Sequence, residues 1–177
     1  AAGGNWRVDP DMRPGGILWS IGDHAFDTLA WITGQQIEEV SAMTDAATGE
    51  RSAGMLLRLS GGAIGYASTS SRAPHARRPF EVQGTRGSLV IRNTYAYLSG
   101  ADEDPRPTLE WHGEDGVKTE HFVPTEVFRI EVEHFNHAIT HGTPPATPGR
   151  QALRALMVSE AAYASVRTGQ AFKITEI

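Results

Sequence analysis

The order of hydrophobic periodicities along the chain constrains its fold more than any other feature. Helical periodicity covers three segments, which are residues 16–33, 126–140 and 151–168. Between the first two of these, residues 37–123 show short apolar runs separated by turn residues. A helix, several hairpin-linked strands and two helices form the order of an α+β fold, in which helices cover one face of a mostly antiparallel sheet.

Glycine positions predict where the strands turn. Gly61–Gly62 and the segment from Gly84 to Gly87 each separate two apolar runs, which predicts two hairpins. The full set of expected strands is residues 37–46, 52–60, 63–71, 80–84, 87–93, 94–99, 107–112, 118–123 and 170–174. If the helices pack on one face of the sheet, the other face needs a packing partner. We expect that partner to be a second subunit.

Composition excludes several classes of protein. The chain has 177 residues and a formal net charge of −5, which argues against a nucleic-acid-binding protein. It contains no cysteine, which excludes a disulfide scaffold and a thiolate metal site and favours a cytoplasmic location. No apolar run is long enough to span a bilayer. The chain lacks an initial Met and opens in an expected loop, so we expect it to be a piece of a longer protein.

A polar stripe on the first predicted helix is the main candidate site. The polar arc of a helical projection lies between apolar residues on both sides and holds Ser20, His24, Asp27 and Trp31. Ile21 belongs to the broad apolar arc opposite, and Phe26 flanks the polar stripe. In that arrangement His24 can donate to Asp27 through one ring nitrogen and face a cleft with the other, as an oriented acid/base does. The alternative is a structural histidine that is hydrogen-bonded and inert.

A histidine cluster on the second predicted helix is a weaker candidate. His134, His137 and His141 are spaced three and four residues apart and share one helix face, as zinc or nickel ligands can. The opposite face carries an apolar stripe that we expect to face the core, formed by Phe128, Val132, Phe135 and Ile139. The histidines then lie on the solvated face, and we expect no native metal site there.

Three motifs, in order, resemble one known family. "WRVDPDMRPGGILWSIGDHAFDTLAWITG" is similar to the start of the C-terminal domain of the Gfo/Idh/MocA oxidoreductases, the relatives of glucose-fructose oxidoreductase and inositol dehydrogenase. "FEVQGTRGSLVI" resembles the strand–turn–strand of that family. "FRIEVEHFNHAITHGTPPATPGRQALRALMVSEAAYASVRTG" resembles its closing helix pair. The resemblance therefore extends over nearly the whole chain.

The resemblance implies a fold and a division of labour between two domains. Residues 1–177 would form a single C-terminal domain for substrate binding and oligomerisation, built on a large open-faced mixed sheet like that of glyceraldehyde-3-phosphate dehydrogenase. NAD or NADP would be held mainly by an N-terminal domain, since this chain contains neither a Gly-x-Gly-x-x-Gly turn nor the Glu-Lys-Pro motif of the family. The partners implied are a sugar or polyol substrate and further copies of the chain, in a homodimer or homotetramer formed through the sheet face.

The resemblance also implies residue roles. His24 matches the family histidine that exchanges a proton with the substrate hydroxyl while hydride leaves the same carbon. Ser20 stands where the family has an aspartate, so it keeps a hydrogen bond but not the charge; Asp23 is a possible substitute. Asp27 matches a second aspartate, with an orienting or structural role.

Trp6 and Arg7 match a stretch near the substrate cleft, where an indole face and a guanidinium suit a sugar. The alternative to this whole interpretation is a non-catalytic association domain that has kept the fold and lost the activity.

Overall fold

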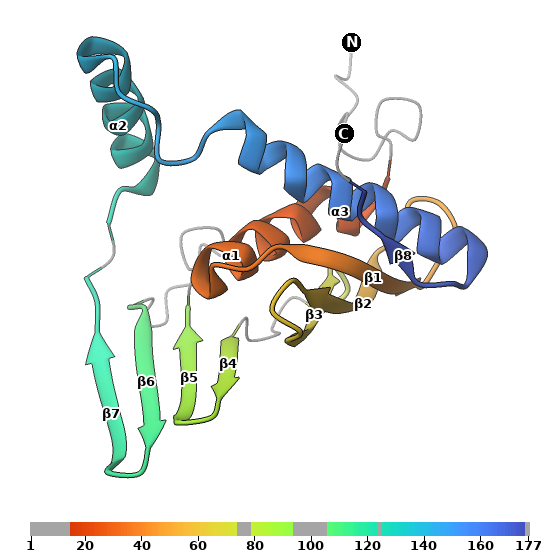
Figure 1. Ribbon diagram of the computed structural model, residues 1–177, viewed down its shortest axis with the longest axis horizontal. Helices are drawn as coiled ribbons and strands as arrows, with labels where there is room; N and C mark the ends of the chain where they lie inside the picture. Colours follow the sequence, from red (N-terminus) through yellow and green to blue (C-terminus); the bar gives the residue numbers. More distant parts are fainter. Residues whose placement is uncertain (1–14, 74–78, 94–105, 124, 176–177) are drawn as a thin grey trace. The chain divides into compact units, whose positions relative to one another are not determined.

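The computed structural model describes residues 15–73, 79–93, 106–123 and 125–175 (Figure 1). It contains two compact units. The first unit comprises residues 1–74 and 144–177, and the second comprises residues 75–143.

The first unit is a four-stranded antiparallel sheet with two helices. Its elements are η2 (Leu18–Gly22), α1 (Asp23–Thr33), β1 (Ile37–Thr44), β2 (Ser52–Leu59), β3 (Ile64–Ser70), α3 (Gly149–Thr168) and β8 (Phe172–Lys173). The strand order is β3-β2-β1-β8, and each pair is antiparallel. The predicted hairpin at Gly61–Gly62 joins β2 to β3, and the predicted stop at Gly34 is the left-handed cap of α1. Glycine adopts that conformation without the steric cost of a Cβ atom.

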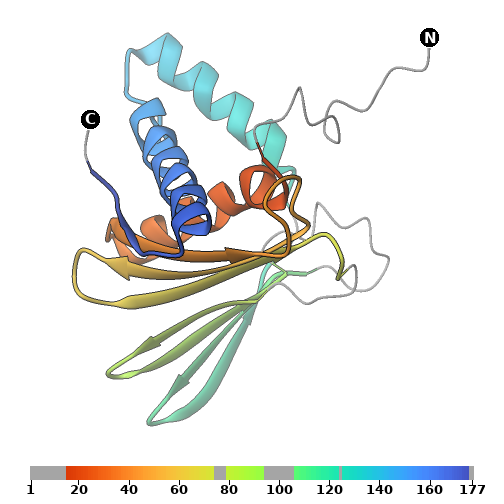
Figure 2. The same cartoon turned by 90° about the vertical axis from the view of Figure 1, so that its right-hand side faces the viewer.

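Helices α1 and α3 lie on the same face of this sheet (Figure 2). Side chains alternate along β2, so that Met55, Leu57 and Leu59 point to the helices and are buried. The helices contribute Phe26 from α1 and, from α3, small residues and Val158 to the same core. Burial of this apolar surface is the main force that holds α1 and α3 on the sheet.

The other face of the first unit's sheet carries exposed apolar side chains. Leu56 on β2 lies directly opposite Tyr66 on β3, and these residues are 55% and 74% exposed. Met43 and Ile64 are also exposed. This arrangement agrees with the prediction that helices cover one face only.

The outer edge of β1 is closed by a strand and a serine. β8 pairs with β1 over only two residues, opposite Glu39 and Val40. Two residues further along β1, the N–H of Ala42 donates to the Oγ of Ser165 at 2.9 Å. The buried Ser165 on α3 thus accepts a backbone hydrogen bond where β8 has ended.

The second unit contains a hairpin-linked sheet and one helix. Its elements are β4 (Phe80–Gly84), β5 (Gly87–Arg92), β6 (Thr108–Gly113), β7 (Gly116–His121) and α2 (Val127–His141). The strands pair in chain order and are antiparallel throughout. The register places Leu89 opposite Trp111 on an apolar face and Val90 opposite Glu110 on the other face. The strand predicted over residues 94–99 lies outside the described residues.

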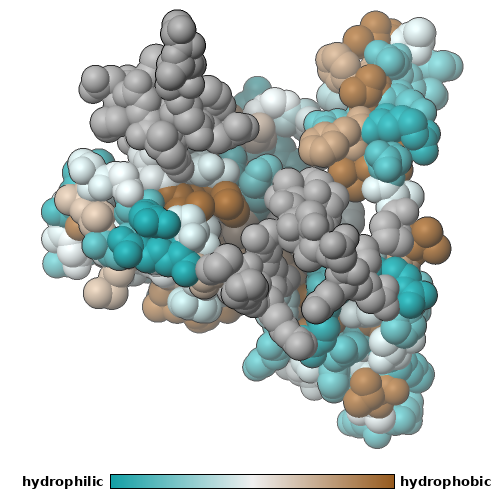
Figure 3. Space-filling view, turned by 180° about the vertical axis from the view of Figure 1, so that it is seen from behind, coloured by the Kyte–Doolittle hydropathy of each residue, from teal (hydrophilic) through white to brown (hydrophobic). Residues whose placement is uncertain are grey.

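The α+β class is confirmed, with two differences from the expected architecture. The described strands form two four-stranded sheets rather than one large sheet, and all their pairings are antiparallel. All four residues of the apolar stripe on α2 were expected to face a core but are more than half exposed: Phe128, Val132, Phe135 and Ile139. The reason is that α2 has no extensive packing partner in the described part of the second unit. Apolar side chains are visible along α2 at the upper right of Figure 3.

None of the described helices combines the length and the apolar composition that a bilayer-spanning helix requires.

Candidate active site

The start of the helix that carries Ser20 and His24 is bound by a buried carboxylate. Glu50, which is 2% exposed and precedes β2, accepts the N–H of Gly16 at 2.9 Å with both carboxylate oxygens. The same side chain accepts the N–H of Leu18 at 3.1 Å, and the backbone carbonyl of Glu50 accepts that of Ile17 at 2.8 Å. The first N–H groups of a helix have no partner within the helix, and Glu50 supplies one for three of them.

Tyr163 on α3 completes this cap. Its hydroxyl donates to Glu50 Oε1 at 2.7 Å and accepts the N–H groups of Gly16 and Trp19 at 3.2 and 3.3 Å. Burial and the hydrogen bond to the Glu50 carboxylate raise the pKa of Tyr163 well above its ordinary value of 10.0, so that the phenol keeps its proton. We call Glu50 and Tyr163 the clamp.

The clamp explains the Gly15–Gly16 pair. A Cβ atom on Gly16 would overlap the backbone and carboxyl group of Glu50, and one on Gly15 would overlap the hydroxyl of Tyr163. Glycine is required at both positions because the backbone approaches the clamp too closely for any side chain.

A π-helical turn follows and changes which residues face the core. Over Leu18–Gly22 more residues are wound into one turn than in an α-helix. As a result, Leu18, Gly22 and Phe26 line up, and a Cβ atom on Gly22 would lie 3.5 Å from Leu18 and 3.7 Å from Phe26. The regular projection was wrong here: it placed Ile21 in the apolar arc and Phe26 beside the polar stripe, whereas Ile21 is 42% exposed and Phe26 is 1% exposed.

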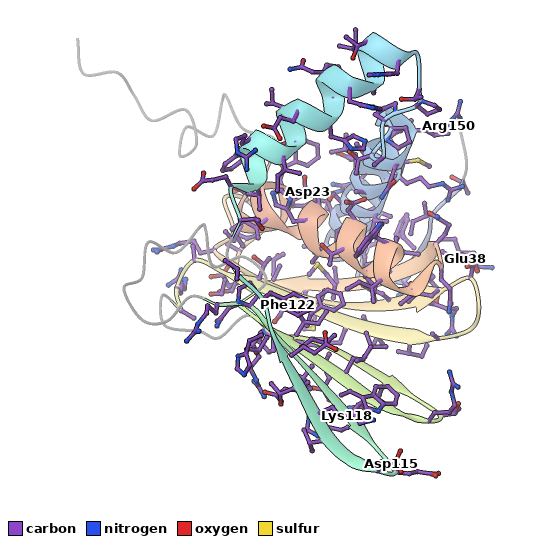
Figure 4. The ribbon with its side chains drawn as sticks, turned by 90° about the vertical axis from the view of Figure 1, so that its left-hand side faces the viewer. Asp23, Glu38, Asp115, Lys118, Phe122 and Arg150 are labelled. Atoms are coloured by element: carbon purple, nitrogen blue, oxygen red, sulfur yellow. The ribbon has the colours of Figure 1, made fainter. Side chains whose placement is uncertain are left out.

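Ser20 and His24 lie four residues apart at the surface of the first unit. Both residues are exposed, so the stripe faces solvent in this chain rather than the interior. Asp23 is partly buried, and its Oδ1 accepts the backbone N–H of His24 at 2.9 Å (Figure 4). Trp6 and Arg7 lie outside the described residues.

Asp27 connects the two helices of the first unit. Its Oδ1 accepts a hydrogen bond from Nε2 of Gln151 on α3 at 2.8 Å. This contact links α1 to α3. The structural and orienting roles expected for Asp27 both stay predictions.

A groove of about 430 Å³ lies between α1 and the first turns of α3. Asp27, Trp31, Gln151, Arg150 and Arg154 are among the residues that line it. Arg150 is labelled at the start of α3 in Figure 4. Trp31, expected beside His24 in the stripe, belongs to this groove, whereas Ser20 and His24 do not line it. The predicted stripe is therefore divided between two surfaces: Asp27 and Trp31 line the groove, and Ser20 and His24 lie outside it.

The histidine cluster on α2 forms a ring stack. The rings of His137 and His141 lie parallel, with centroids 4.0 Å apart, and Nδ1 of His141 lies 3.0 Å from the carbonyl oxygen of His137. In the part of the chain that the structure describes, no three His, Asp or Glu side chains are grouped as ligands of one metal ion.

Sequence reasoning missed Glu50, Tyr163 and Gln151. Each of them hydrogen-bonds to the first helix or its start from a distant position in the sequence. The bonded residues are separated by 34, 147 and 124 positions, respectively. The one available signal was the Gly-Gly pair, since glycines at the start of a helix indicate a close approach of other atoms.

Comparisons with known proteins agree with this fold. Residues 1–90 match the model of the GFO/IDH/MocA C-terminal domain. The chain is 27% identical to D-xylose 1-dehydrogenase (NADP(+)) 2 from Haloferax volcanii over 95% of its length, and 29% identical to inositol 2-dehydrogenase from Rhizobium meliloti over 90%. It spans about half the length of these curated relatives, 50% in each case.

Solved structures show the same fold. An oxidoreductase domain protein from Kribbella flavida superposes with a TM-score of 0.80 at 22% identity, over 97% of this chain and 55% of that one. Aldose-aldose oxidoreductase from Caulobacter crescentus, complexed with glycerol, gives 0.80 at 20% identity, over 96% and 51%.

Proposed function

Because this chain belongs to the GFO/IDH/MocA family, we propose that it is the substrate-binding half of a nicotinamide-dependent oxidoreductase acting on a sugar, a polyol or a related alcohol or ketone. Its relatives include enzymes named for D-xylose and for myo-inositol, which supports this substrate class.

The chain does not fit NAD or NADP by itself. It contains no Gly-x-Gly-x-x-Gly turn between a strand and a helix, which is the element that brings the backbone close to a pyrophosphate. The cofactor is therefore assigned mainly to an N-terminal domain. This chain is expected to be inactive without that domain.

The observation that carries the proposal is an exposed imidazole on a helix with a fixed start. His24 lies four residues beyond Ser20 and eight beyond Gly16, whose N–H is held by the clamp. In the proposed reaction His24 exchanges a proton with the substrate hydroxyl while the hydride passes between the same carbon and the nicotinamide. Ser20 contributes a hydrogen bond to that hydroxyl, and Asp27 holds α1 against α3.

Substrate binding is assigned to polar groups around His24. Asp23 lies next to it on α1, with its carboxylate partly exposed. Trp6 and Arg7 precede the helix in the sequence and would supply an aromatic face and a guanidinium fork to the sugar.

We assign the exposed sheet face of the first unit to contact between copies of the chain, in a homodimer or homotetramer. Met43, Leu56, Ile64 and Tyr66 form an apolar surface there, and surfaces of this kind mark protein interfaces. A cytoplasmic location is the expected setting for such an enzyme.

The test uses the protein expressed from its complete reading frame. D-xylose and myo-inositol are assayed with NAD⁺ and NADP⁺, and His24→Ala is compared with wild type. We expect turnover to fall about 10²-fold or more with the cofactor KM nearly unchanged, since the cofactor is held elsewhere. His24→Asn should fold normally and also fail to turn over, because its amide does not titrate.

His121→Ala is the matched control, because that histidine is exposed at the end of β7. Wild-type turnover in His24→Ala would overturn the assignment of His24.

A second candidate function is a non-catalytic association domain. Ser20 favours it, because serine cannot supply the carboxylate that the family pattern has at this position. A complete protein that forms oligomers but turns over neither sugar nor polyol, with either cofactor, would support this alternative.

A further inference from the structure

We propose that Glu50 and Tyr163 are positioning residues of the proposed reaction, which set the place of His24 by fixing the start of its helix. The inference rests on the proposed function.

The hydrogen bonds of the clamp end where the site residues begin. The N–H groups of residues 16–19 all go to Glu50 or Tyr163. Ser20 is the next residue, and its N–H goes to the carbonyl of Gly16 at 3.3 Å, which is the first contact within the helix. Every backbone donor that precedes Ser20 in the described helix start is therefore held by a group outside the helix.

The clamp ties this start to two separate elements of the core. Glu50 precedes β2, and Tyr163 lies on α3 beside the buried Ala162. Neither position is a neighbour of the helix in sequence. The start of the helix is thereby fixed in both position and rotation, because the two anchors approach it from different parts of the first unit.

A buried carboxylate is a costly way to fill this space. Taking the Glu50 carboxylate out of water carries a desolvation cost that its hydrogen bonds must offset, and apolar residues of similar volume often serve stability equally well. What a carboxylate provides and an apolar side chain does not is a fixed set of directions for the N–H groups. We therefore infer that the clamp fixes the direction of the start of the helix and does not only stabilise the fold.

Position matters strongly for the proposed proton transfer. His24 is six residues beyond Leu18, which places it more than one helical turn from the clamp. A tilt or rotation at the clamp is carried to the imidazole over that length. Misplacing a catalytic group by about 1 Å can cost about 10²-fold in rate.

The raised pKa of Tyr163 supports a constant clamp. The phenol stays protonated through the neutral range and donates to Glu50 throughout, so Tyr163 adds no titration to the pH–rate profile.

The experiment uses the complete protein and five variants, of which two weaken the clamp, one keeps its charge and two are matched controls. Tyr163→Phe removes one hydroxyl, and Glu50→Gln removes the charge and replaces one of the two oxygens that accept the N–H of Gly16 by an NH₂ donor. The matched controls are Thr119→Val, which removes an exposed hydroxyl on β7, and Glu38→Gln, at an exposed glutamate of β1. Kinetics are measured below the melting temperature of the least stable variant. The substrate is D-xylose or myo-inositol, whichever the wild-type protein turns over.

We expect kcat to fall at least tenfold in Tyr163→Phe and further in Glu50→Gln, with the cofactor KM unchanged and the controls at wild-type kcat. Amide hydrogen exchange at Gly16, Leu18 and Trp19 should accelerate in the same variants. Glu50→Asp keeps the charge and should recover part of the lost kcat. If Glu50→Gln does not fold, Tyr163→Phe carries the test, since it removes a single atom.

The outcomes separate this inference from the proposed function. Loss of turnover in His24→Ala together with wild-type kcat in Tyr163→Phe and Glu50→Gln overturns the positioning role alone. A fall in melting temperature with kcat unchanged shows a merely structural clamp and also overturns it. Wild-type turnover in His24→Ala defeats both proposals.

Discussion

Gly16 and Glu50 lie so close together that a Cβ atom on the glycine would overlap the backbone and the carboxyl group of the glutamate. We therefore expect Gly16→Ala to destabilise the chain by about 1–3 kcal/mol, the usual cost of overpacking a filled site. Denaturant unfolding measures this. Gly149→Ala is the control, because the space around Gly149 is open and alanine favours a helix, so its stability should be equal or slightly higher. Equal stability of the two variants would contradict the close approach.

Asp45 should make stability dependent on acid pH. The backbone N–H groups of Arg51 and Ser52, followed by the charge of Arg72, hold the pKa of Asp45 below its ordinary value of 3.8. A lowered pKa in the folded state gives stability that is complete above the ordinary pKa and is lost as pH falls through the folded value.

The free energy of unfolding is measured with urea from pH 6 to pH 2, for wild type and for Asp45→Asn. The difference between the two proteins should therefore be largest at pH 6 and should disappear as the pH falls. Asp115→Asn, in the exposed turn between β6 and β7, is the control. A difference that stays constant with pH would show that Asp45 contributes through shape and not through charge.

Ser20→Asp should shift the pH optimum of the complete enzyme upward. The added carboxylate lies four residues before His24, where a nearby anion favours the charged imidazolium. The pH–rate profile measures this shift, and Ser20→Asn, which adds similar volume without charge, should leave the optimum in place. Superimposable profiles for Ser20→Asp and wild type would argue against an interaction between the two positions.

The exposed sheet face should make the chain self-associate. Sedimentation at micromolar concentration is expected to show a dimer or a larger species. Leu56→Glu, in the centre of that face opposite Tyr66, should shift it toward monomer because a charge would be buried at the contact. Leu153→Glu, on α3, is the control. A wild-type monomer with no affinity for a dye that binds exposed apolar surface would refute this.

Local signals were enough to predict the elements. Gly34 ends α1 and Gly61–Gly62 turns the β2–β3 hairpin as expected, because each depends on the conformation of one or two residues. The candidate site could be predicted only in part from such local signals. His24 and Ser20 could be selected from spacing, whereas the π-helical turn at Leu18–Gly22 changed the phase of the helix and reversed the expected environments of Ile21 and Phe26.

The clamp was beyond local reasoning altogether. Glu50 lies in a turn-rich segment with nothing in its neighbourhood to indicate burial, and Tyr163 occupies one position in a long helix. Their contact with residues 16–19 exists only after the first unit has formed.

The hydroxyl of Ser165, which accepts the N–H of Ala42 beyond the end of β8, bears on the solubility of the chain. A sheet border with a continuous row of open donors and acceptors invites a strand from another molecule, and stacking of this kind leads to fibrils. Here the edge strand β8 is only two residues long. The N–H of Ala42, which follows on β1, is already bonded to Ser165 of α3. Ser165→Ala would leave the N–H of Ala42 without this partner, so we expect that variant to pair more readily with a strand from another molecule at the β8 side of the sheet.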